Sequence, residues 1–215
     1  MDSNLSERYL SVRNTVPQTV ELVVVSKNQS VEKIKTIYDG GHRSFGENKV
    51  MELLDKKHLL PPDIQWHLIG HLQTNKVKYI APFVHLIHSL DSTKLAAEID
   101  KQANKHNRLI DCLLEVFIAS EETKFGFSFE ETRDFLDNQK SKFPNIRITG
   151  FMGMATNTND TQKVKREFKA LADFYHKNEK IYSLKYLSMG MTNDYHIAIE
   201  EGSNMVRIGS AIFNE

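Results

Sequence analysis

The stretch VELVVVSK, residues 20–27, decides the fold. Apart from Glu21 it is an unbroken apolar run of mostly β-branched residues that ends at Ser26 and Lys27. A strand with one face in water would alternate polar and apolar residues, so this run predicts a parallel strand that is covered on both faces. Parallel neighbours need a long crossover connection, usually a helix. The rest of the chain should therefore alternate strands with helices.

Seven further runs follow this pattern, rich in β-branched or aromatic residues and mostly ended by Gly, Ser or Asn. They cover residues 43–46, 64–70, 84–89, 109–117, 146–152, 184–189 and 204–209. Segments of helical period separate most of them, for example Val164, Phe168 and Leu171. Eight such units favour a closed (β/α)8 TIM barrel, with an amphipathic helix over 3–15 before it. The weakest strands are 43–46 and 184–189, and they leave an open sheet as the alternative.

Composition argues against several classes of function. The chain has 215 residues, with 28 basic and 28 acidic side chains, so a general electrostatic grip on nucleic acid or an anionic membrane is not expected. One cysteine, Cys112, excludes an intrachain disulfide, and the absence of an HExxH pattern argues against a metal site. The pairs His67/His71 and His85/His88 are interpreted as core or rim residues. No linker, leader-like start or membrane-length apolar run is present, which predicts one cytoplasmic domain over 1–215. Without an exposed apolar stripe, we expect a monomer.

Residues at the strand ends are the candidates for chemistry, because a parallel barrel carries its site at the carboxyl ends of its strands. Lys27 ends the first run. It is either a solvated charge or, at a barrel mouth, a desolvated amine with a lowered pKa that acts as a Schiff-base nucleophile.

The last two runs are followed by Ser188 to Asp194 and by Gly209 and Ser210. Loops after strands seven and eight form the recurrent phosphate site of such barrels, since glycine allows close backbone approach and hydroxyls donate hydrogen bonds. Each pair alone could equally be a turn or a cap. Their coincidence at both strand ends predicts a phosphate site.

Two further polar residues allow two interpretations each, and a third allows one. Arg207 should face the barrel interior, where a buried guanidinium needs an acceptor, and an ion pair with Glu115 is the structural alternative to a ligand. Asn48 follows a strand end and either contacts a ligand or caps the next helix. Lys56 lies in a charged run that is typical of a solvated helix face.

The motifs LVVVSK (22–27), FGEN (45–48), WHLIGHLQTNK (66–76), KFGF (124–127), GFMGM (150–154) and LSMGMTNDYHIAIEEGSNMVRIGSAIF (187–213) occur in this order. This set closely resembles the pyridoxal phosphate homeostasis protein family, also called YggS/PROSC. The resemblance runs from about Val20 to Phe213. It implies a fold-type III, alanine-racemase-like barrel. Only seven residues follow Ile208, so we expect no C-terminal β-domain.

The resemblance also implies roles for individual residues. Lys27 matches the lysine that forms an internal aldimine with pyridoxal 5'-phosphate (PLP), and Asn48 matches a neighbour of the cofactor ring. Arg207 matches the residue that faces the pyridine nitrogen. Ser188, Gly209 and Ser210 match phosphate-binding positions. Met189 matches a pocket methionine of less certain role. Many relatives carry Thr in place of Ser210, which preserves the hydroxyl.

The leading hypothesis from this resemblance is a protein that buffers PLP and delivers it to PLP-dependent apoenzymes, with no catalytic residue of its own. The first alternative is a single-domain amino-acid racemase, for which Tyr195 and His67 are poor candidates as a second base. A Schiff-base aldolase acting on a phosphorylated sugar is the second alternative. An arginine at the ring nitrogen should disfavour its protonation and so weaken carbanion chemistry.

Overall fold

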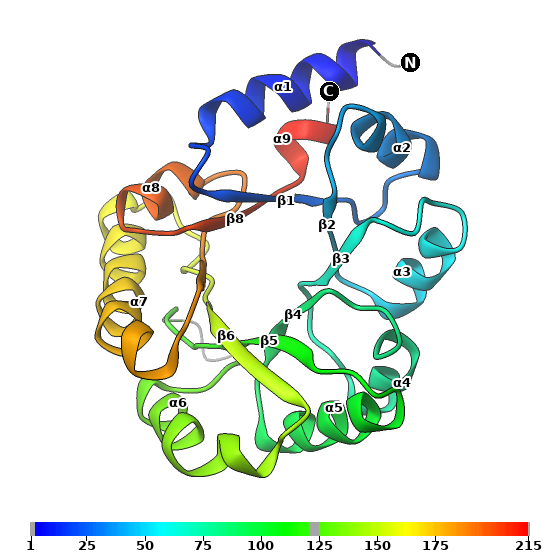
Figure 1. The fold of residues 1–215 in the computed structure, drawn as a ribbon. Helices are drawn as coiled ribbons and strands as arrows, with labels where there is room; N and C mark the ends of the chain where they lie inside the picture. Colours follow the sequence, from blue (N-terminus) through cyan, green and yellow to red (C-terminus); the bar gives the residue numbers. More distant parts are fainter. Residues whose placement is uncertain (1–2, 121–124, 215) are drawn as a thin grey trace.

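The computed structural model describes residues 3–120 and 125–214, and within them eight parallel strands close into a barrel. Each strand pairs with the next, and β1 pairs with β8 (Figure 1). The predicted TIM barrel is confirmed. The two weakest predicted strands are both present and complete the ring, so the open-sheet alternative is wrong. The strands are β1 (Glu21–Val25), β2 (Ser44–Glu47), β3 (Gln65–Leu68), β4 (Leu86–Leu90), β5 (Ile110–Glu115), β6 (Ile146–Met152), β7 (Tyr186–Ser188) and β8 (Met205–Ile208).

Helices surround this barrel, and capping residues in the sequence mark where several of them begin. Four of them begin after a residue whose side chain accepts a backbone N–H of the first turn, namely Ser30, Ser92, Ser128 and Asp160. The helices are α1 (Ser3–Thr15), α2 (Val31–Asp39), α3 (Val50–Lys57), α4 (Val77–Ile80), α5 (Thr93–Lys105), α6 (Phe129–Asp134), α7 (Thr161–Tyr182), α8 (Tyr195–Glu200) and α9 (Ser210–Phe213), with short helical turns at Thr74–Lys76, Phe135–Gln139 and Lys140–Lys142.

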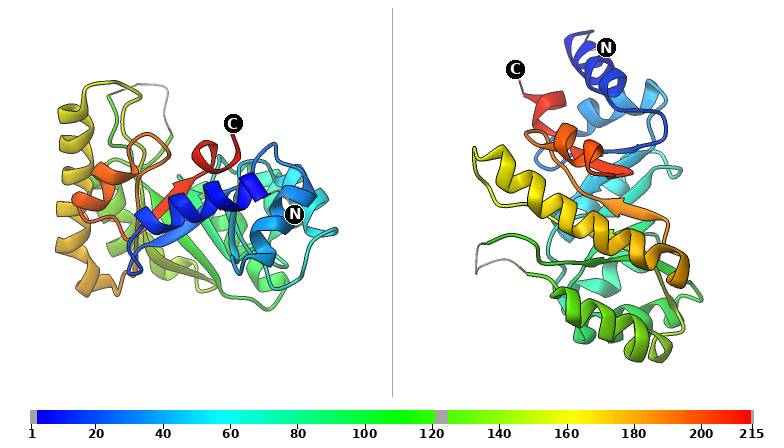
Figure 2. Two further views of the ribbon diagram at one scale, coloured as in Figure 1. Left: turned by 90° about the horizontal axis from the view of Figure 1, so that it is seen from above. Right: turned by 90° about the vertical axis from the view of Figure 1, so that its left-hand side faces the viewer.

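The N-terminal helix α1 lies outside the strand–helix repeat, as predicted for 3–15. It packs beside α9, so the two ends of the chain lie close together (Figures 1 and 2). Arg8 Nε donates to the carbonyl oxygen of Ile212 at 3.0 Å, and Tyr9 OH lies 3.2 Å from His42 Nδ1. These contacts join α1 to both the last helix and the start of β2.

The barrel interior is layered because side chains alternate in and out along each strand. A central apolar layer is formed by Val23, Leu86, Leu113, Met152 and Met205. Two residues further along β4, β5 and β8, on the same inner face, stand His88, Glu115 and Arg207. A layer of polar side chains therefore lies on the carboxyl-end side of the apolar layer. Within residues 3–120 and 125–214, none of the helices combines the length and the apolar character of a membrane span.

Candidate functional site

A cavity of about 940 Å³ opens at the carboxyl ends of the strands. It is lined by five of the seven residues that the sequence nominates: Lys27, Asn48, Arg207, Gly209 and Ser210. These come from the ends of β1, β2 and β8, which are neighbours in the closed sheet. The barrel therefore brings together an amine, a guanidinium and a hydroxyl at one mouth.

Lys27 lies in a turn, and side chains of α3 hold the backbone of the residue on each side of it by hydrogen bonds. Lys56 Nζ donates to the Ser26 carbonyl oxygen at 2.6 Å, and Glu52 Oε1 accepts the backbone N–H of Asn28 at 2.5 Å. Asn28 has a φ of 60°, the left-handed region that asparagine tolerates better than most residues. The Lys27 side chain itself is exposed. Protein groups alone therefore leave this side chain in contact with solvent, which agrees with the first of the two alternatives that the sequence left open.

The support beneath this turn is a buried charge cluster. Lys56 Nζ also donates to Glu47 Oε1 at 2.7 Å and to Glu52 Oε1 at 2.6 Å, and Ser26 Oγ donates to Glu47 Oε1 at 2.6 Å. Burial raises the pKa of Glu47, while hydrogen bonds from Lys56 and Ser26 oppose that rise. The prediction of a solvated Lys56 was wrong: 6% of the residue is exposed, because α3 packs this face onto the ends of β1 and β2.

Arg207 projects into the barrel from β8 and its guanidinium is fixed by neutral acceptors. Its Nη1 donates to the Ser188 carbonyl oxygen at 2.9 Å and to Ser188 Oγ at 2.6 Å, and its Nη2 donates to the Gly153 carbonyl oxygen at 3.2 Å. Burial lowers the pKa of Arg207 to about 10, against the opposing charges of Asp194 and Glu115, so the group is a cation at neutral pH. The predicted interior position is confirmed, but the acceptors are not the carboxylate of Glu115.

Glu115 ends β5 and is the buried carboxyl group of this cavity, with 5% of the residue exposed. Burial raises its pKa to about 7; the charge of Asp91 adds to the rise and Arg207 opposes it. The cavity thus contains a carboxyl group that titrates near neutral pH. The sequence offered Glu115 only as an ion-pair partner for Arg207.

The loops after β7 and β8 meet at the cavity, as predicted for an anion site. Ser210 Oγ lies 3.0 Å from Thr192 Oγ1, which places two hydroxyl groups side by side. A Cβ on Gly209 would stand 2.9 Å from the carbonyl oxygen of Val25, so only glycine allows this loop to approach the end of β1. The arrangement offers hydroxyl donors and close backbone approach to an anion.

Ser188 and Met189 do not line the cavity. Ser188 is fully buried below Arg207, and its hydroxyl lies 3.2 Å from His88 Nδ1. Met189 is fully buried in the outer core, and its backbone N–H is bonded to the carbonyl oxygen of Met205 at 3.1 Å. The cavity is lined instead by Met191 and Thr192 of the following loop. The phosphate contact of Ser188 and the pocket role of Met189 remain predictions from the resemblance.

Asn48 lines the cavity and is not a helix cap, so the capping interpretation was wrong. The N-cap of α3 is Lys49, which makes no side-chain capping bond. A Cβ on Gly70 would lie 2.6 Å from the Asn48 carbonyl oxygen, so the glycine after β3 allows the Asn48 backbone to pass close by. Asn48 is thereby held at the cavity wall.

Sequence reasoning missed much of the cavity wall. One part is the polar loop between β6 and α7, where Thr156 Oγ1 donates to Glu167 Oε1 at 2.7 Å. The sequence feature that could have indicated this loop is the Thr- and Asn-rich run 156–159, which follows a strand. Another is a stack of the His71 and Phe125 rings, with centroids 4.2 Å apart. Phe125 follows KFGF residue Lys124, which lies outside the described residues.

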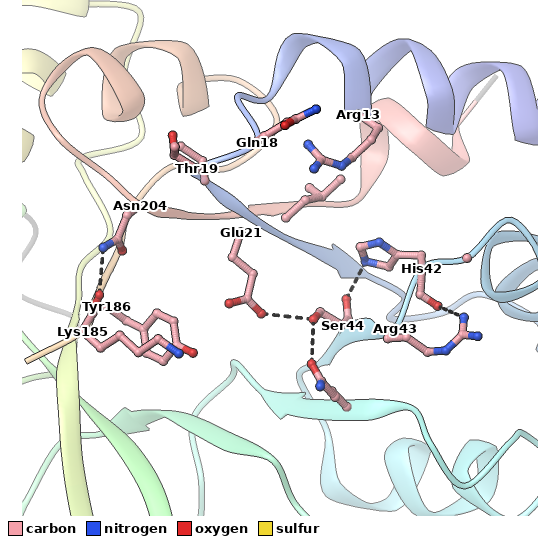
Figure 3. A pocket seen from close by; sticks show the side chains of 14 residues that line it. Arg13, Gln18, Thr19, Glu21, His42, Arg43, Ser44, Lys185, Tyr186 and Asn204 are labelled. Carbon is pink, nitrogen blue, oxygen red and sulfur yellow. Dashed lines mark hydrogen bonds between the residues drawn. The ribbon is translucent and has the colours of Figure 1, made fainter.

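A second cavity, of about 540 Å³, lies at the amino ends of the strands (Figure 3). Its polar groups are largely bonded to one another: Ser44 Oγ donates to Glu21 Oε1 at 3.1 Å, and Asn204 Nδ2 donates to the Lys185 carbonyl oxygen at 2.8 Å. His42 bonds through both ring nitrogens, to Tyr9 and to the Ser44 carbonyl oxygen. Burial lowers the pKa of His42 to about 4.

The side chains at the carboxyl end suit a ligand with three features. An exposed primary amine suits a carbonyl group, and paired hydroxyls suit an anion. A cation with N–H groups that no described residue accepts suits an electron-rich ring atom. Tyr195 and His67 do not line this cavity: Tyr195 OH is bonded to Thr15 Oγ1 at 2.8 Å, and His67 is buried in the barrel. Among the described residues no group of three or more His, Cys, Asp or Glu could hold a metal ion.

Comparison with known proteins defines the class first. A family model described as the N-terminal domain of alanine racemase matches residues 2–215. The alanine racemase of Clostridium difficile shares the fold with a TM-score of 0.80 at 13% identity, and the match covers 57% of that chain.

Closer relatives define the family. The pyridoxal phosphate homeostasis protein of Aquifex aeolicus is 40% identical over 198 residues, covering 91% of this chain and 86% of that one. The Synechocystis protein of the same name is 34% identical over 212 residues, covering 96% of both chains. PipY of Synechococcus elongatus PCC7942, in its structure with PLP bound, matches with a TM-score of 0.88 at 31% identity, covering 98% of this chain and all of that one. The chain belongs to the pyridoxal phosphate homeostasis protein family.

Proposed function

We propose that the chain binds PLP at the carboxyl-end cavity, buffers it, and delivers it to PLP-dependent apoenzymes. The observation that carries this proposal is the convergence of Lys27, Arg207 and the Ser210–Thr192 hydroxyl pair on one cavity. The cofactor supplies an aldehyde that condenses reversibly with primary amines. Its aldehyde, ring nitrogen and phosphate are the three features that these side chains suit. The PLP-bound PipY structure supports the assignment.

Each residue has a definite task in this proposal. Lys27 provides the amine, and the Lys56 cluster holds the backbone on both sides of it. Ser210, Thr192 and the close approach at Gly209 would hold the phosphate, and Asn48 would lie beside the ring. Arg207, a cation whose hydrogen bonds to the described residues go to neutral acceptors, would face the ring nitrogen and oppose its protonation. A ring kept unprotonated is a weak electron sink, which favours holding the cofactor over carbanion chemistry.

Exposure of Lys27 fits delivery. An amine from a client enzyme could reach the covalent linkage at this open mouth and displace Lys27, without unfolding the barrel. Fast amino-acid racemisation would need a second acid–base group positioned over the substrate, and the two candidates from the sequence lie elsewhere. Weak racemase activity is the second candidate function, since the fold is shared with alanine racemases.

The test is transfer of the cofactor. The PLP-loaded protein, freed of excess cofactor by gel filtration, is mixed with an excess of an apo-aminotransferase, and recovered aminotransferase activity is followed. We expect activity in proportion to the carrier added, and none when the protein is Lys27→Ala. In parallel, loss of the α-proton of L-alanine in D2O is followed by NMR. No transfer, or α-proton exchange at many turnovers per second, would contradict the carrier assignment.

A further inference from the structure

A continuous line of polar side chains crosses the barrel interior. Arg207 Nη1 is bonded to Ser188 Oγ at 2.6 Å, Ser188 Oγ lies 3.2 Å from His88 Nδ1, and His88 Nε2 lies 2.9 Å from His67 Nδ1. The four side chains come from β8, β7, β4 and β3, and none is more than 3% exposed. They connect the carboxyl-end cavity to the middle of an otherwise apolar core.

Two ends of this line, Arg207 and the carboxylate of Glu21, favour one direction for its hydrogen bonds. A guanidinium only donates, so Ser188 Oγ accepts from it, and His88 Nδ1 at 3.2 Å is the acceptor that the described residues offer to the hydroxyl hydrogen. His88 then carries its proton on Nε2 and donates to His67 Nδ1, and His67 in turn carries its proton on Nε2. In this arrangement both histidines carry their proton on Nε2.

The far end of the line supports this direction. His67 Nε2 is buried, has no hydrogen-bond partner among the described residues, and lies 3.9 Å from Glu21 Oε1. Glu21 belongs to the amino-end cavity, where its carboxylate is bonded to Ser44 (Figure 3). An N–H that faces a carboxylate is favourable, whereas a bare ring nitrogen would be repelled by it. Burial lowers the pKa of His67 to about 3 and that of His88 well below its usual value, so both rings are neutral.

Neutral partners have an electrostatic consequence for the cavity. Of the five N–H groups of the guanidinium, three are bonded to Ser188 and Gly153, which leaves Nε–H and one Nη2–H without a protein acceptor among the described residues. Arg207 lines the cavity, so its charge and its remaining donors are available there. A carboxylate in the place of Ser188 would have neutralised that charge.

We propose that His88 and Ser188 are positioning residues: the His67–His88–Ser188 line fixes Arg207 so that its remaining N–H groups meet the ring of the bound cofactor. This rests on the proposed function. It assigns Ser188 a role at the ring end of the cofactor, by way of Arg207, instead of direct contact with the phosphate.

The line itself is tested without cofactor. Nitrogen-15 NMR of the histidine rings in the ligand-free protein at pH 7 should show His67 and His88 neutral and protonated on Nε2. In Ser188→Ala the His88 Nδ1 signal should shift, because its donor is lost. A His88 ring protonated on Nδ1 or doubly protonated would overturn the proposal.

The positioning role is tested with two ligands, PLP and pyridoxal, which lacks the phosphate. Ser188→Ala should raise both dissociation constants by the same factor, about tenfold, because the hydroxyl acts through Arg207 on the shared ring. Ser188→Thr should restore most of the binding. Ser203→Ala is the matched control: Ser203 is also buried, and its hydroxyl bonds among the described residues are with backbone groups of Leu187, Met189 and Met205.

The outcomes separate the two proposals. Weakened PLP binding with unchanged pyridoxal binding would place Ser188 at the phosphate and overturn the positioning role, as would no change with either ligand. If the wild-type protein bound neither ligand, the proposed function would fail and the positioning role with it. The NMR measurement would still report whether the hydrogen-bonded line exists.

Discussion

Both mouths of the barrel carry a polar cavity, yet only the one at the carboxyl end has the character of a binding site. At the amino end, Glu21, Ser44, His42 and Asn204 are hydrogen-bonded to one another or to backbone. At the carboxyl end, Lys27 is exposed and Arg207 has N–H groups that no described protein group accepts. A cluster of polar residues becomes a site when its donors are not already bonded within the protein.

The largest effect expected from this contrast concerns the two lysines of the cavities. Lys27→Ala should abolish covalent binding of PLP, seen as loss of the visible absorption band of the loaded protein, while the fold persists because the side chain is exposed. Lys185→Ala, in the amino-end cavity, should keep the band. Equal loss in both variants would remove the distinction between the mouths.

The next effect is on stability. Lys56→Met leaves Glu47 buried without its partner, and breaking a buried pair in this way costs about 3–5 kcal/mol in the free energy of unfolding. Removing both charges, as Lys56→Met with Glu47→Gln, should recover most of that loss. Urea denaturation of the ligand-free protein measures both. If Lys56→Met alone were as stable as wild type, the buried charge cluster beneath Lys27 would be contradicted.

Ser210→Ala tests the anion end of the cavity. Loss of one hydrogen bond to a charged phosphate is worth roughly 1.5–3 kcal/mol, about 10- to 150-fold in the dissociation constant of PLP. Ser44→Ala, which removes a hydroxyl from the amino-end cavity, should leave that constant unchanged. The PLP dissociation rate, followed by trapping the released cofactor, decides between the two outcomes.

The smallest effects have opposite signs at the two mouths. His42 has a pKa of about 4 in the folded chain against 6.5 in the unfolded chain, so acid favours the unfolded state. Lowering the pH from 7 to 5 should reduce the free energy of unfolding by about 2 kcal/mol, a loss that His42→Gln should not show.

Glu115 has a pKa of about 7 in the folded chain against 4.5 in the unfolded chain, so the same change of pH should raise the free energy of unfolding by about 2 kcal/mol. Glu115→Gln should not show this gain. Denaturation curves at pH 7, 6 and 5 measure both slopes. Matching slopes in wild type and variants would contradict these burials.

The parts of the molecule that the sequence predicted follow from period and position. Apolar runs identified all eight strands, and the rule that sites lie at strand ends singled out Lys27 and Ser210. Side-chain alternation along the last strand placed Arg207 inside the barrel, and the three residues meet at the cavity. Ser188 shows the limit of that rule. Ser188 is the last residue of β7 and its side chain turns into the barrel, while Thr192 in the following loop reaches the cavity.

Other features depend on contacts that no local pattern contains. Lys56 has the helical spacing of a surface residue relative to Glu52, and only the packing of α3 against Ser26, 30 residues earlier, buries it. The bond between His67 and His88 likewise joins residues of two strands whose register was unknown from the sequence. Tertiary packing determined which of these polar residues are bonded and which remain available.

The most direct test of the account is to load the protein with PLP, reduce it with borohydride and identify the modified peptide by mass spectrometry. We predict one labelled residue, Lys27, at the carboxyl-end cavity. Labelling of Lys185 at the amino end, or a protein that takes up no cofactor, would contradict it.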